Sequence, residues 1–254
     1  MVFSATDTTG ASASAQVPIE AGSGAPLLRA VVHAAAGSVQ SAACSPGSLA
    51  SAEGEWLSDG VASVPAGQTT LAGARVLING QYAPLVHSSP QKIVFVCPAG
   101  SRETVSVSVE TEAGRSAAVQ APAADSAPGI FTVDGSGQGQ AAGAIFGGLR
   151  LAMARNYRFA SQPAQPGDSL WLTVTGLSAN AGSDRLMANI GGVEAPVDSV
   201  RPLAGLAGVM QVAVSIPAAA ATGDSVPVAI REFLPDGRVA SSQTAMIAIE
   251  PVRP

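Results

Sequence analysis

Apolar and polar residues alternate in short stretches along most of the chain. Residues 104–110 place three valines on one face, and residues 210–216 repeat the pattern. A period of two is typical of a half-buried strand. The best helix candidates, 30–36 and 217–221, are short and lack an amphipathic stripe. The same patterning predicts further strands at 75–78, 93–97, 170–174, 226–230 and 246–249.

Turn-forming residues separate these strands at the spacing of an antiparallel sandwich. Asn79-Gly80, Ala113-Gly114 and Asp236-Gly237 predict hairpins, because Gly, Asn and Asp tolerate the positive φ of tight turns. Pro227 cannot donate a hydrogen bond to a sheet, so its strand is predicted to lie at an edge. The predicted fold class is therefore all-β.

An internal repeat organises the chain. Each copy has the size of an immunoglobulin-like (Ig-like) sandwich, which predicts tandem Ig-like β-sandwich domains at 25–126 and 127–254. Four motifs return in the same order: 45–49 as 165–170, 78–85 as 190–197, 93–98 as 212–217, and the hairpin at Gly114 as the one at Gly237.

Residues 1–24 stand outside both copies. Two alternating stretches, 2–7 and 11–19, flank a turn and predict a β-hairpin. A lone hairpin is marginal in water. It must therefore pack on the next domain, add to a sheet edge in its own or a neighbouring chain, or end a domain that lies upstream. The second alternative predicts a strand-exchange oligomer through residues 1–21.

Composition excludes two classes of partner. The 13 basic residues are outnumbered by 18 acidic ones and never cluster, so nucleic acid is not expected as a partner. No apolar run approaches the roughly 18 to 20 residues that span a bilayer, so no membrane insertion is expected. We expect any export signal to lie outside the given sequence.

The motifs, in their order, resemble an uncharacterised C-terminal tandem Ig-like domain found in large secreted acidobacterial proteins of the Solibacter type. The resemblance covers about residues 30 to 250, and residues 3–19 resemble the last hairpin of a cadherin-like or putative Ig repeat. It is carried by 45–49, 78–85, 88–93, 127–132, 166–170, 176–177, 195–197 and 210–212.

This resemblance implies secretion or cell-surface placement and a structural or adhesive role without established chemistry. Two departures stand out. Residues 50–54 replace the family's bulky alternating residues with small ones, so a short or irregular strand is expected there. Lys92-Ile93-Val94 replaces the family's usual Gln-Ile-Asn.

Cys44 and Cys97 are the only cysteines and fall in one predicted domain. In an exported protein, a bridge closing a loop of about 50 residues stabilises by roughly 3 to 4 kcal/mol. We predict this disulfide, with two buried reduced thiols as the alternative. A metal site would need further Cys or His nearby, so neither a metal nor another cofactor is expected.

Catalytic motifs are weak in this sequence. No Gly-x-Ser-x-Gly elbow frames a serine, and the only histidines are His33 and His87. His87 is expected to be a half-buried packing residue, and a triad of His33 or His87 with Asp59 or Asp125 is the alternative. Residues 134–143 loosely match a dinucleotide fingerprint, but the glycines that follow disfavour its helix, so a turn is predicted, with calcium binding as the alternative.

The remaining candidates are acidic and aromatic residues. Glu53 and Glu55 are interpreted as solvated loop residues rather than a glycosidase pair. Trp56 and Tyr82 are the candidates for ligand binding, whereas Trp171 is predicted to lie in the core or between domains.

The sequence thus predicts a non-catalytic structural, adhesion or assembly module of a secreted or cell-surface bacterial protein. Its partners would be other protein domains or surface glycans. A hydrolase for esters, glycosides or phosphoesters, with a site on the sandwich loops, is one alternative. A carbohydrate-binding module is the other.

Overall fold

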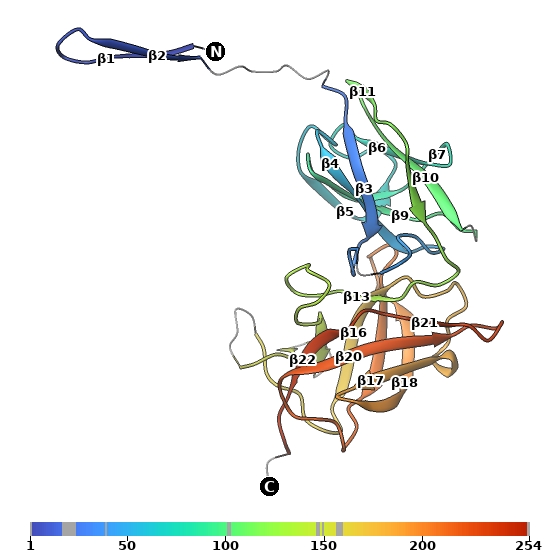
Figure 1. Cartoon of the computed structure of the whole chain (residues 1–254). Coiled ribbons are helices and arrows are strands. Elements are labelled where there is room, and N and C mark those ends of the chain that lie inside the picture. The colour runs from blue at the N-terminus through green and yellow to red at the C-terminus, as the bar shows by residue number, and fades with distance from the viewer. Residues whose placement is uncertain are drawn as a thin grey trace.

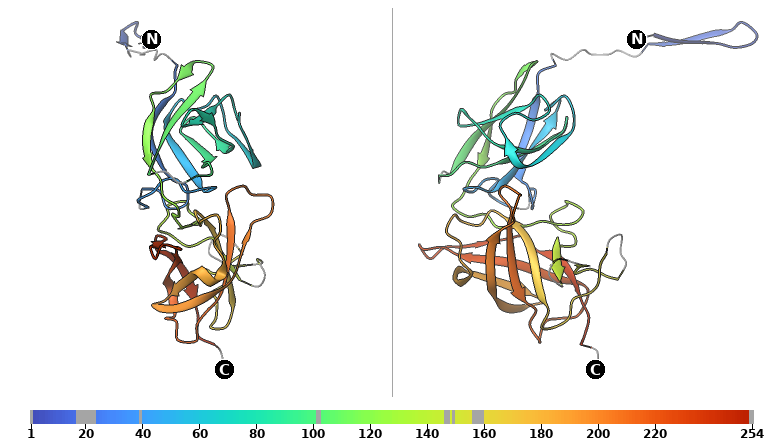
Figure 2. Two further views of the ribbon diagram at one scale, coloured as in Figure 1. Left: turned by 90° about the vertical axis from the view of Figure 1, so that its right-hand side faces the viewer. Right: turned by 180° about the vertical axis from the view of Figure 1, so that it is seen from behind.

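The computed structural model describes residues 2–16, 24–38, 40–100, 103–145, 148, 150–155 and 160–252. Within these residues the chain is all-β apart from one short 3-10 turn, η2 (Ser183–Arg185). Two β-sandwich units stand end to end, with a thin hairpin beyond the first (Figures 1 and 2). We call residues 24–122 the N-terminal unit and residues 129–252 the C-terminal unit.

The N-terminal unit packs two antiparallel sheets face to face. Inward residues of one sheet, such as Ile93 and Phe95, meet Val76 and Val107 of the other in a single buried core. The first sheet has the order β3 (Leu27–His33), β4 (Leu49–Glu55), β9 (Lys92–Val96), β8 (Leu85–Ser88), β5 (Ala62–Gln68). The second has the order β11 (Gly114–Arg115), β10 (Thr104–Thr111), β6 (Arg75–Ile78), β7 (Gln81–Tyr82), with β12 (Val119–Pro122) also on β10.

The C-terminal unit has its own core and one continuous set of strand pairings. The order is β15 (Arg150–Leu151), β14 (Gly143–Ile145), β16 (Ser169–Thr175), β19 (Met210–Ser215), β18 (Val193–Pro202), β17 (Leu186–Ile190), β20 (Gly223–Phe233), β21 (Val239–Ser241). In addition, β13 (Gly129–Ile130) pairs with β16, and β22 (Ala245–Ile249) pairs with β20. Strand β18 belongs to both layers: its first half pairs with β17 and its second half with β19, with a register shift between Val197 and Ser199.

The internal repeat reappears in the strand pairings. The pairs β4–β9, β6–β10 and β10–β12 of the N-terminal unit match β16–β19, β17–β20 and β20–β22 of the C-terminal unit. The units differ where the first has two short strands, β7 and β8, separated by Ala83-Pro84. In the C-terminal unit the matching Ala195-Pro196 lies inside the long strand β18.

The predicted strands and the three hairpin turns are confirmed. The N-terminal hairpin forms β1 (Val2–Thr6) and β2 (Ser12–Gln16), which make a two-stranded sheet of their own. Residues 17–19, also predicted to belong to the hairpin, lie outside the described residues. No helix in the described part of the chain is long and apolar enough to span a membrane.

Neither weak helix candidate forms a helix: residues 30–36 form the end of β3 and a turn, and a turn lies within 217–221. The structure corrects two local predictions. Residues 50–54 lie in the seven-residue central strand β4 rather than in a short strand, and Ala50 and Ala52 are fully buried there. The expected irregularity is limited to a register shift in β3, between Leu28 and Ala30, opposite Gly54 and Glu53.

Pro227 is the second correction, because its strand β20 is central rather than at an edge. The Pro227 carbonyl accepts a hydrogen bond from Gly191 N in the turn beyond β17. The N–H that proline lacks would point the same way, past the end of the β17 ladder, so no ladder bond is lost.

Candidate functional site: the joint between the two units

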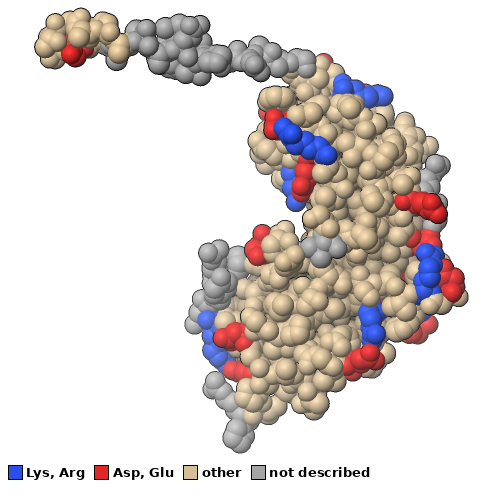
Figure 3. Space-filling model, in the orientation of Figure 1, with Lys and Arg blue, Asp and Glu red and all other residues tan. Residues whose placement is uncertain are grey.

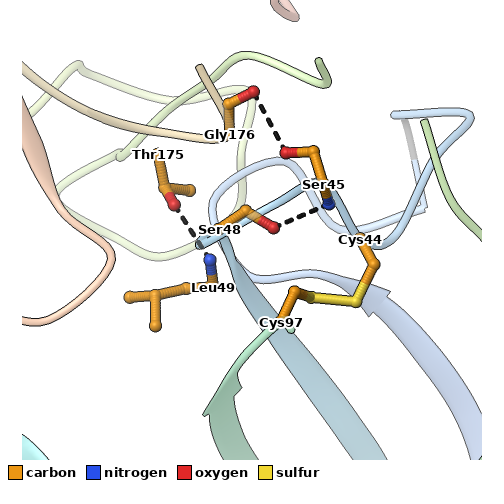
Figure 4. Close-up of a disulfide and its surroundings, with 7 residues drawn as sticks. All are labelled: Cys44, Ser45, Ser48, Leu49, Cys97, Thr175 and Gly176. Carbon is orange, nitrogen blue, oxygen red and sulfur yellow. Dashed lines mark hydrogen bonds between the residues drawn. A yellow bond between two sulfur atoms is a disulfide. The ribbon is translucent and has the colours of Figure 1, made fainter. Parts of the chain in front are cut away.

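The joint between the units centres on Gly176, the residue that follows β16. Its carbonyl accepts hydrogen bonds from Ala127 N (2.8 Å), from Ser45 Oγ (3.1 Å) and from Ser126 Oγ (3.3 Å). Gly176 has φ +83, and an ideal Cβ there would lie 1.8 Å from the Ala127 carbonyl oxygen. Only glycine therefore allows this approach. Figure 4 shows Ser45 reaching Gly176 across the joint.

A second crossing lies beside the first. Thr175 Oγ1 accepts a hydrogen bond from Leu49 N at 2.9 Å and donates one to the Gly208 carbonyl at 2.6 Å. One buried hydroxyl thus ties the start of β4 to two segments of the C-terminal unit. Figure 4 shows its bond to Leu49. The Ala207 amide adds a third crossing, donating to the Pro65 carbonyl at 2.9 Å.

Glu232 anchors the connecting segment from inside the C-terminal unit. Its side chain is fully buried, and Oε2 accepts hydrogen bonds from Ser126 Oγ (2.6 Å) and Ser178 N (3.0 Å). Ser178 Oγ donates to Oε1. A buried carboxylate requires such donors, because its desolvation would otherwise be very costly. Ser126 is therefore held at a fixed position between the units.

His33 fills the space between the units. The side chain is 1% exposed, and its Nδ1 accepts hydrogen bonds from Ala35 N (3.3 Å) and Ala36 N (3.1 Å). Burial lowers the pKa of His33 to about 4, and the Ala127 carbonyl acts weakly in the opposite direction. Nε2 has no well-formed hydrogen bond among the described residues. His33 is therefore a neutral packing residue.

The predicted disulfide is present between Cys44 and Cys97. It joins the residue before Ser45 to the end of β9, directly beneath the joint (Figure 4). Ser45 N donates a hydrogen bond to Ser48 Oγ at 2.9 Å. The bridge thus holds the turn that supplies Ser45 and Leu49 to the joint.

A polar cavity of about 320 Å³ opens at one side of the joint. Gln40 lies in its wall and donates from Nε2 to the carbonyls of Pro128 (2.7 Å) and Ser241 (3.0 Å), one on the connecting segment and one on β21. On another side, Leu49 and Val64 face Leu206 and Val209 across an apolar cleft of about 320 Å³.

The two predicted ligand-binding aromatics lie on different sheets. Trp56 follows β4, is 54% exposed and has φ +53, an unusual backbone conformation for a bulky residue. Tyr82 in β7 is 45% exposed, donates to Glu110 Oε1 at 3.2 Å, and has the Arg75 guanidinium 5.0 Å from its ring centroid. The structure therefore does not place them in one binding platform.

Trp171 is corrected. It is half-buried on the outward face of β16, with the Arg201 guanidinium 4.3 Å from its ring centroid. It belongs neither to the core nor to the joint.

The predicted triad alternative is not assembled. His87 Nδ1 lies 2.9 Å from Ser63 Oγ, its cross-strand neighbour, but in the described part of the chain no carboxylate contacts the ring. Partial burial, followed by the nearby Lys92, lowers the pKa of His87. Asp125 instead pairs with Arg238. Ser63 and His87 thus form a serine–histidine pair that lacks the orienting acid of a triad.

The other acidic candidates have structural roles. Glu53 and Glu55 lie in β4 rather than in a loop, and Glu55 forms an ion pair with Arg29 at 2.7 Å. Asp134 caps its own turn, and hydrogen bonds from Ser136 hold the pKa of its carboxyl below the usual value. The glycine-rich segment leads into the strand β14, as the predicted turn requires. In the described residues no cluster of His, Cys, Asp or Glu could hold a metal ion.

Charge adds no further site on the face seen in Figure 3. Basic and acidic side chains there are scattered, mostly beside one another, and large areas carry neither.

Sequence reasoning missed the residues that make the joint. For the contacts of Thr175 and Gly176 across the joint no local signal exists, because their partners lie about 30 to 130 positions away. For Glu232 a signal was present: Val226, Val228 and Ile230 alternate inward, and the same phase places Glu232 on the buried face.

No family model and no curated protein matches the chain. Among solved structures it is similar to SGBP-B of the mixed-linkage glucan utilization locus of Bacteroides ovatus, in complex with a heptasaccharide, at 13% identity and TM-score 0.36, covering 82% of this chain and 43% of that one. It is also similar to the gamma-CGTase of alkalophilic Bacillus clarkii, at 12% identity and TM-score 0.31, covering 98% of this chain and 32% of that one. A third similar structure is SGBP-B from a complex xyloglucan utilization locus in Bacteroides uniformis. Its identity is 14% and its TM-score 0.26, and the match covers 89% of this chain and 49% of that one. The chain spans less than half the length of each, and we infer nothing about function from similarities of this size.

Proposed function

We propose that the chain is a non-catalytic structural module that holds two β-sandwich domains, 25–126 and 127–254, in a fixed series within a secreted or cell-surface bacterial protein. The observation that carries this proposal is the buried joint at Gly176. The resemblance to tandem Ig-like domains of large secreted acidobacterial proteins belongs to the same proposal.

Rigidity follows from the number and spread of the crossings. Domains of one chain usually move relative to each other unless their interface is large or well bonded. Here hydrogen bonds cross at Ser45, at Leu49, at Pro65 and at Gln40, which lie on different segments of the N-terminal unit. Bending in any direction would break one of these bonds, and loss of those at Ser45 and Leu49 would leave buried polar groups unpaired.

Nuclear spin relaxation of backbone amides tests the proposal. Amides in β9 and β10 report on the N-terminal unit, and amides in β19 and β20 report on the C-terminal unit. We expect one rotational diffusion tensor to fit all four strands. A control variant with six Gly/Ser residues inserted after Ala124 lengthens the connecting segment and should give separate, shorter correlation times. Separate correlation times in the unmodified chain would overturn the proposal.

Glycan binding through Trp56 or Tyr82 is the second candidate, and the exposure of both rings favours it. A glycan array compares the unmodified chain with Trp56→Ala and Tyr82→Ala, and binding lost in one variant would assign the ring. Hydrolysis stays a prediction without an assembled site. Turnover of chromogenic esters that disappears in Ser63→Ala would establish it.

A further inference from the structure

The apolar cleft of about 320 Å³ between the two units has the size of a small-molecule site. Pockets for small molecules measure roughly 300 to 1,000 Å³ and are lined mainly by apolar side chains with a few polar groups. We call this cleft the Leu206 cleft. Both units contribute to its lining: Leu49, Ser63, Val64, Pro65 and Val86 from the N-terminal unit, and Leu206, Ala207 and Val209 from the C-terminal unit.

A bulge in the edge strand β5 builds the wall on the N-terminal unit. Residues 64–67 of β5 stand opposite Val86 of β8 alone. Such a bulge bends a strand and turns its side chains out of the regular alternation. The Pro65 carbonyl in this bulge accepts the hydrogen bond from Ala207 N at 2.9 Å, so the bulged segment is fixed against the C-terminal unit.

The loop between β18 and β19 builds the opposite wall. Leu203 N donates to the Val209 carbonyl at 2.9 Å, and Leu206 N donates to the Leu203 carbonyl at 3.1 Å. An ideal Cβ on Gly208, which has φ +72, would lie 2.9 Å from Leu49 Cγ, so glycine lets the loop lie directly against Leu49. In the left view of Figure 2 this loop, in orange, extends to the N-terminal unit. Both walls are therefore held in place before a ligand binds, which lowers the entropic cost of binding.

One polar pair borders the cleft. Ser63 is the only polar side chain among the described lining residues, and its Oγ lies 2.9 Å from His87 Nδ1. Burial lowers the pKa of His87 below 6.5, so this pair is uncharged at neutral pH. Lys92, whose charge also acts on His87, is the register partner of Glu53. Since none of the described lining residues is ionisable, the cleft favours an uncharged ligand.

The Ser63–His87 pair also selects the head group of the ligand. In a neutral imidazole one nitrogen donates and the other accepts, so Ser63 offers the ligand either a lone pair or a proton, depending on the tautomer of His87. A hydroxyl group both donates and accepts, and it therefore suits either arrangement. The other lining residues are aliphatic, which suits an alkyl chain.

We propose that the Leu206 cleft binds an uncharged molecule that carries an alkyl chain and a hydroxyl head, with the hydroxyl at Ser63. The alkyl chain would contact both units at once. A ligand that binds only while the units are in contact stabilises that contact by mass action. The inference rests on the joint of the proposed function, because the two walls of the cleft come from different units.

Methyl NMR of leucine and valine residues tests binding at the cleft itself. Butanol, hexanol and octanol are titrated into the full chain. We expect the methyl resonances of Val86 and Leu206 to shift, and those of Val105 and Val226, which lie in the two cores, to stay in place. Each methylene that the cleft encloses should tighten binding about fourfold. Hexanoate should bind about tenfold more weakly than hexanol, because its carboxylate would lose water without gaining a partner.

Three variants assign the binding to the cleft. Leu206→Ser removes part of one wall at a position that is 45% exposed, and Leu27→Ser makes the same change in β3, outside the cleft, at a position that is 42% exposed. Hexanol binding should weaken about fivefold to tenfold in Leu206→Ser and stay unchanged in Leu27→Ser. Ser63→Ala should weaken hexanol binding about twofold to tenfold and leave the binding of pentane, which has no head group, unchanged.

Several results would overturn the proposal. Equal shifts at core and cleft methyls would indicate a general solvent effect of the alcohol. Equal losses in Leu206→Ser and Leu27→Ser would place the binding elsewhere, and hexanoate binding as tight as that of hexanol would contradict the uncharged head. Cleft shifts that follow protein concentration without alcohol would assign the cleft to a second copy of the chain.

The relaxation experiment on the unmodified chain separates a failure of the ligand site from a failure of the joint. One diffusion tensor together with unshifted cleft methyls would refute the ligand site alone. Separate correlation times would refute the fixed joint and, with it, the cleft.

Discussion

Replacing Gly176 with alanine should loosen the joint by an amount that can be separated from backbone strain. The new Cβ would lie 1.8 Å from the oxygen and 2.7 Å from the carbon of the Ala127 carbonyl. Both are backbone atoms, so no side chain can rotate away. The Ala127 segment must therefore move, and with it the hydrogen bonds that Ala127 N and Ser45 Oγ make to the Gly176 carbonyl.

Gly80 provides a matched control. Its φ is also +83, but nothing lies within 4 Å of an ideal Cβ there. Both alanine variants lose about 1 to 2 kcal/mol, because an L-residue is strained in the left-handed region. Gly176→Ala also loses two buried hydrogen bonds at about 1 kcal/mol each. We expect total losses of about 1 to 2 kcal/mol for Gly80→Ala and about 3 to 4 kcal/mol for Gly176→Ala.

Urea unfolding followed by circular dichroism measures both losses, with the Gly176→Ala chain also examined for separate transitions of the two units. A joint that couples the units should weaken in Gly176→Ala, so that the transitions separate. Equal losses of stability in the two variants would refute the reasoning, because strain at positive φ would then explain both.

Two further predictions concern the same region. Because burial lowers the pKa of His33 from 6.5 to about 4, the unfolded chain binds its proton first as the pH falls. The free energy of unfolding should therefore decrease between pH 6.5 and about 4, by about 3 kcal/mol in total. His33→Asn should lose this part of the pH dependence in urea titrations, and an unchanged slope would contradict the assignment. The Cys44–Cys97 bridge spans 53 positions, so the Cys44→Ser/Cys97→Ser variant should lose about 4 kcal/mol in the N-terminal unit. A free energy of unfolding that the double variant leaves unchanged would contradict this prediction.

The sequence predicts most of the strands because burial on a two-sided sheet leaves a period of two along the chain. It misjudged residues 50–54, where small residues hide the alternation although the strand is central. The sequence could not identify Thr175 or Gly176 as joint residues. The role of a hydroxyl or of a missing Cβ depends on the partner beside it, and these partners come close only when the chain folds. Trp56 was visible as an exposed aromatic, but its positive φ directly after β4 came only from the structure.

The bridge beneath the joint also sets how far the chain extends when it is pulled from its ends. When force is applied along the series of units in Figure 1 and the N-terminal unit unfolds, only the residues outside the Cys44–Cys97 loop can extend. The disulfide keeps the residues inside the loop from extending. With 53 positions enclosed, and about 3.4 Å for each extended residue, about 180 Å of contour length stays withheld. A stretched chain would therefore keep the turn carrying Ser45 close to β9, and the N-terminal unit could refold from a shorter tether once the tension falls.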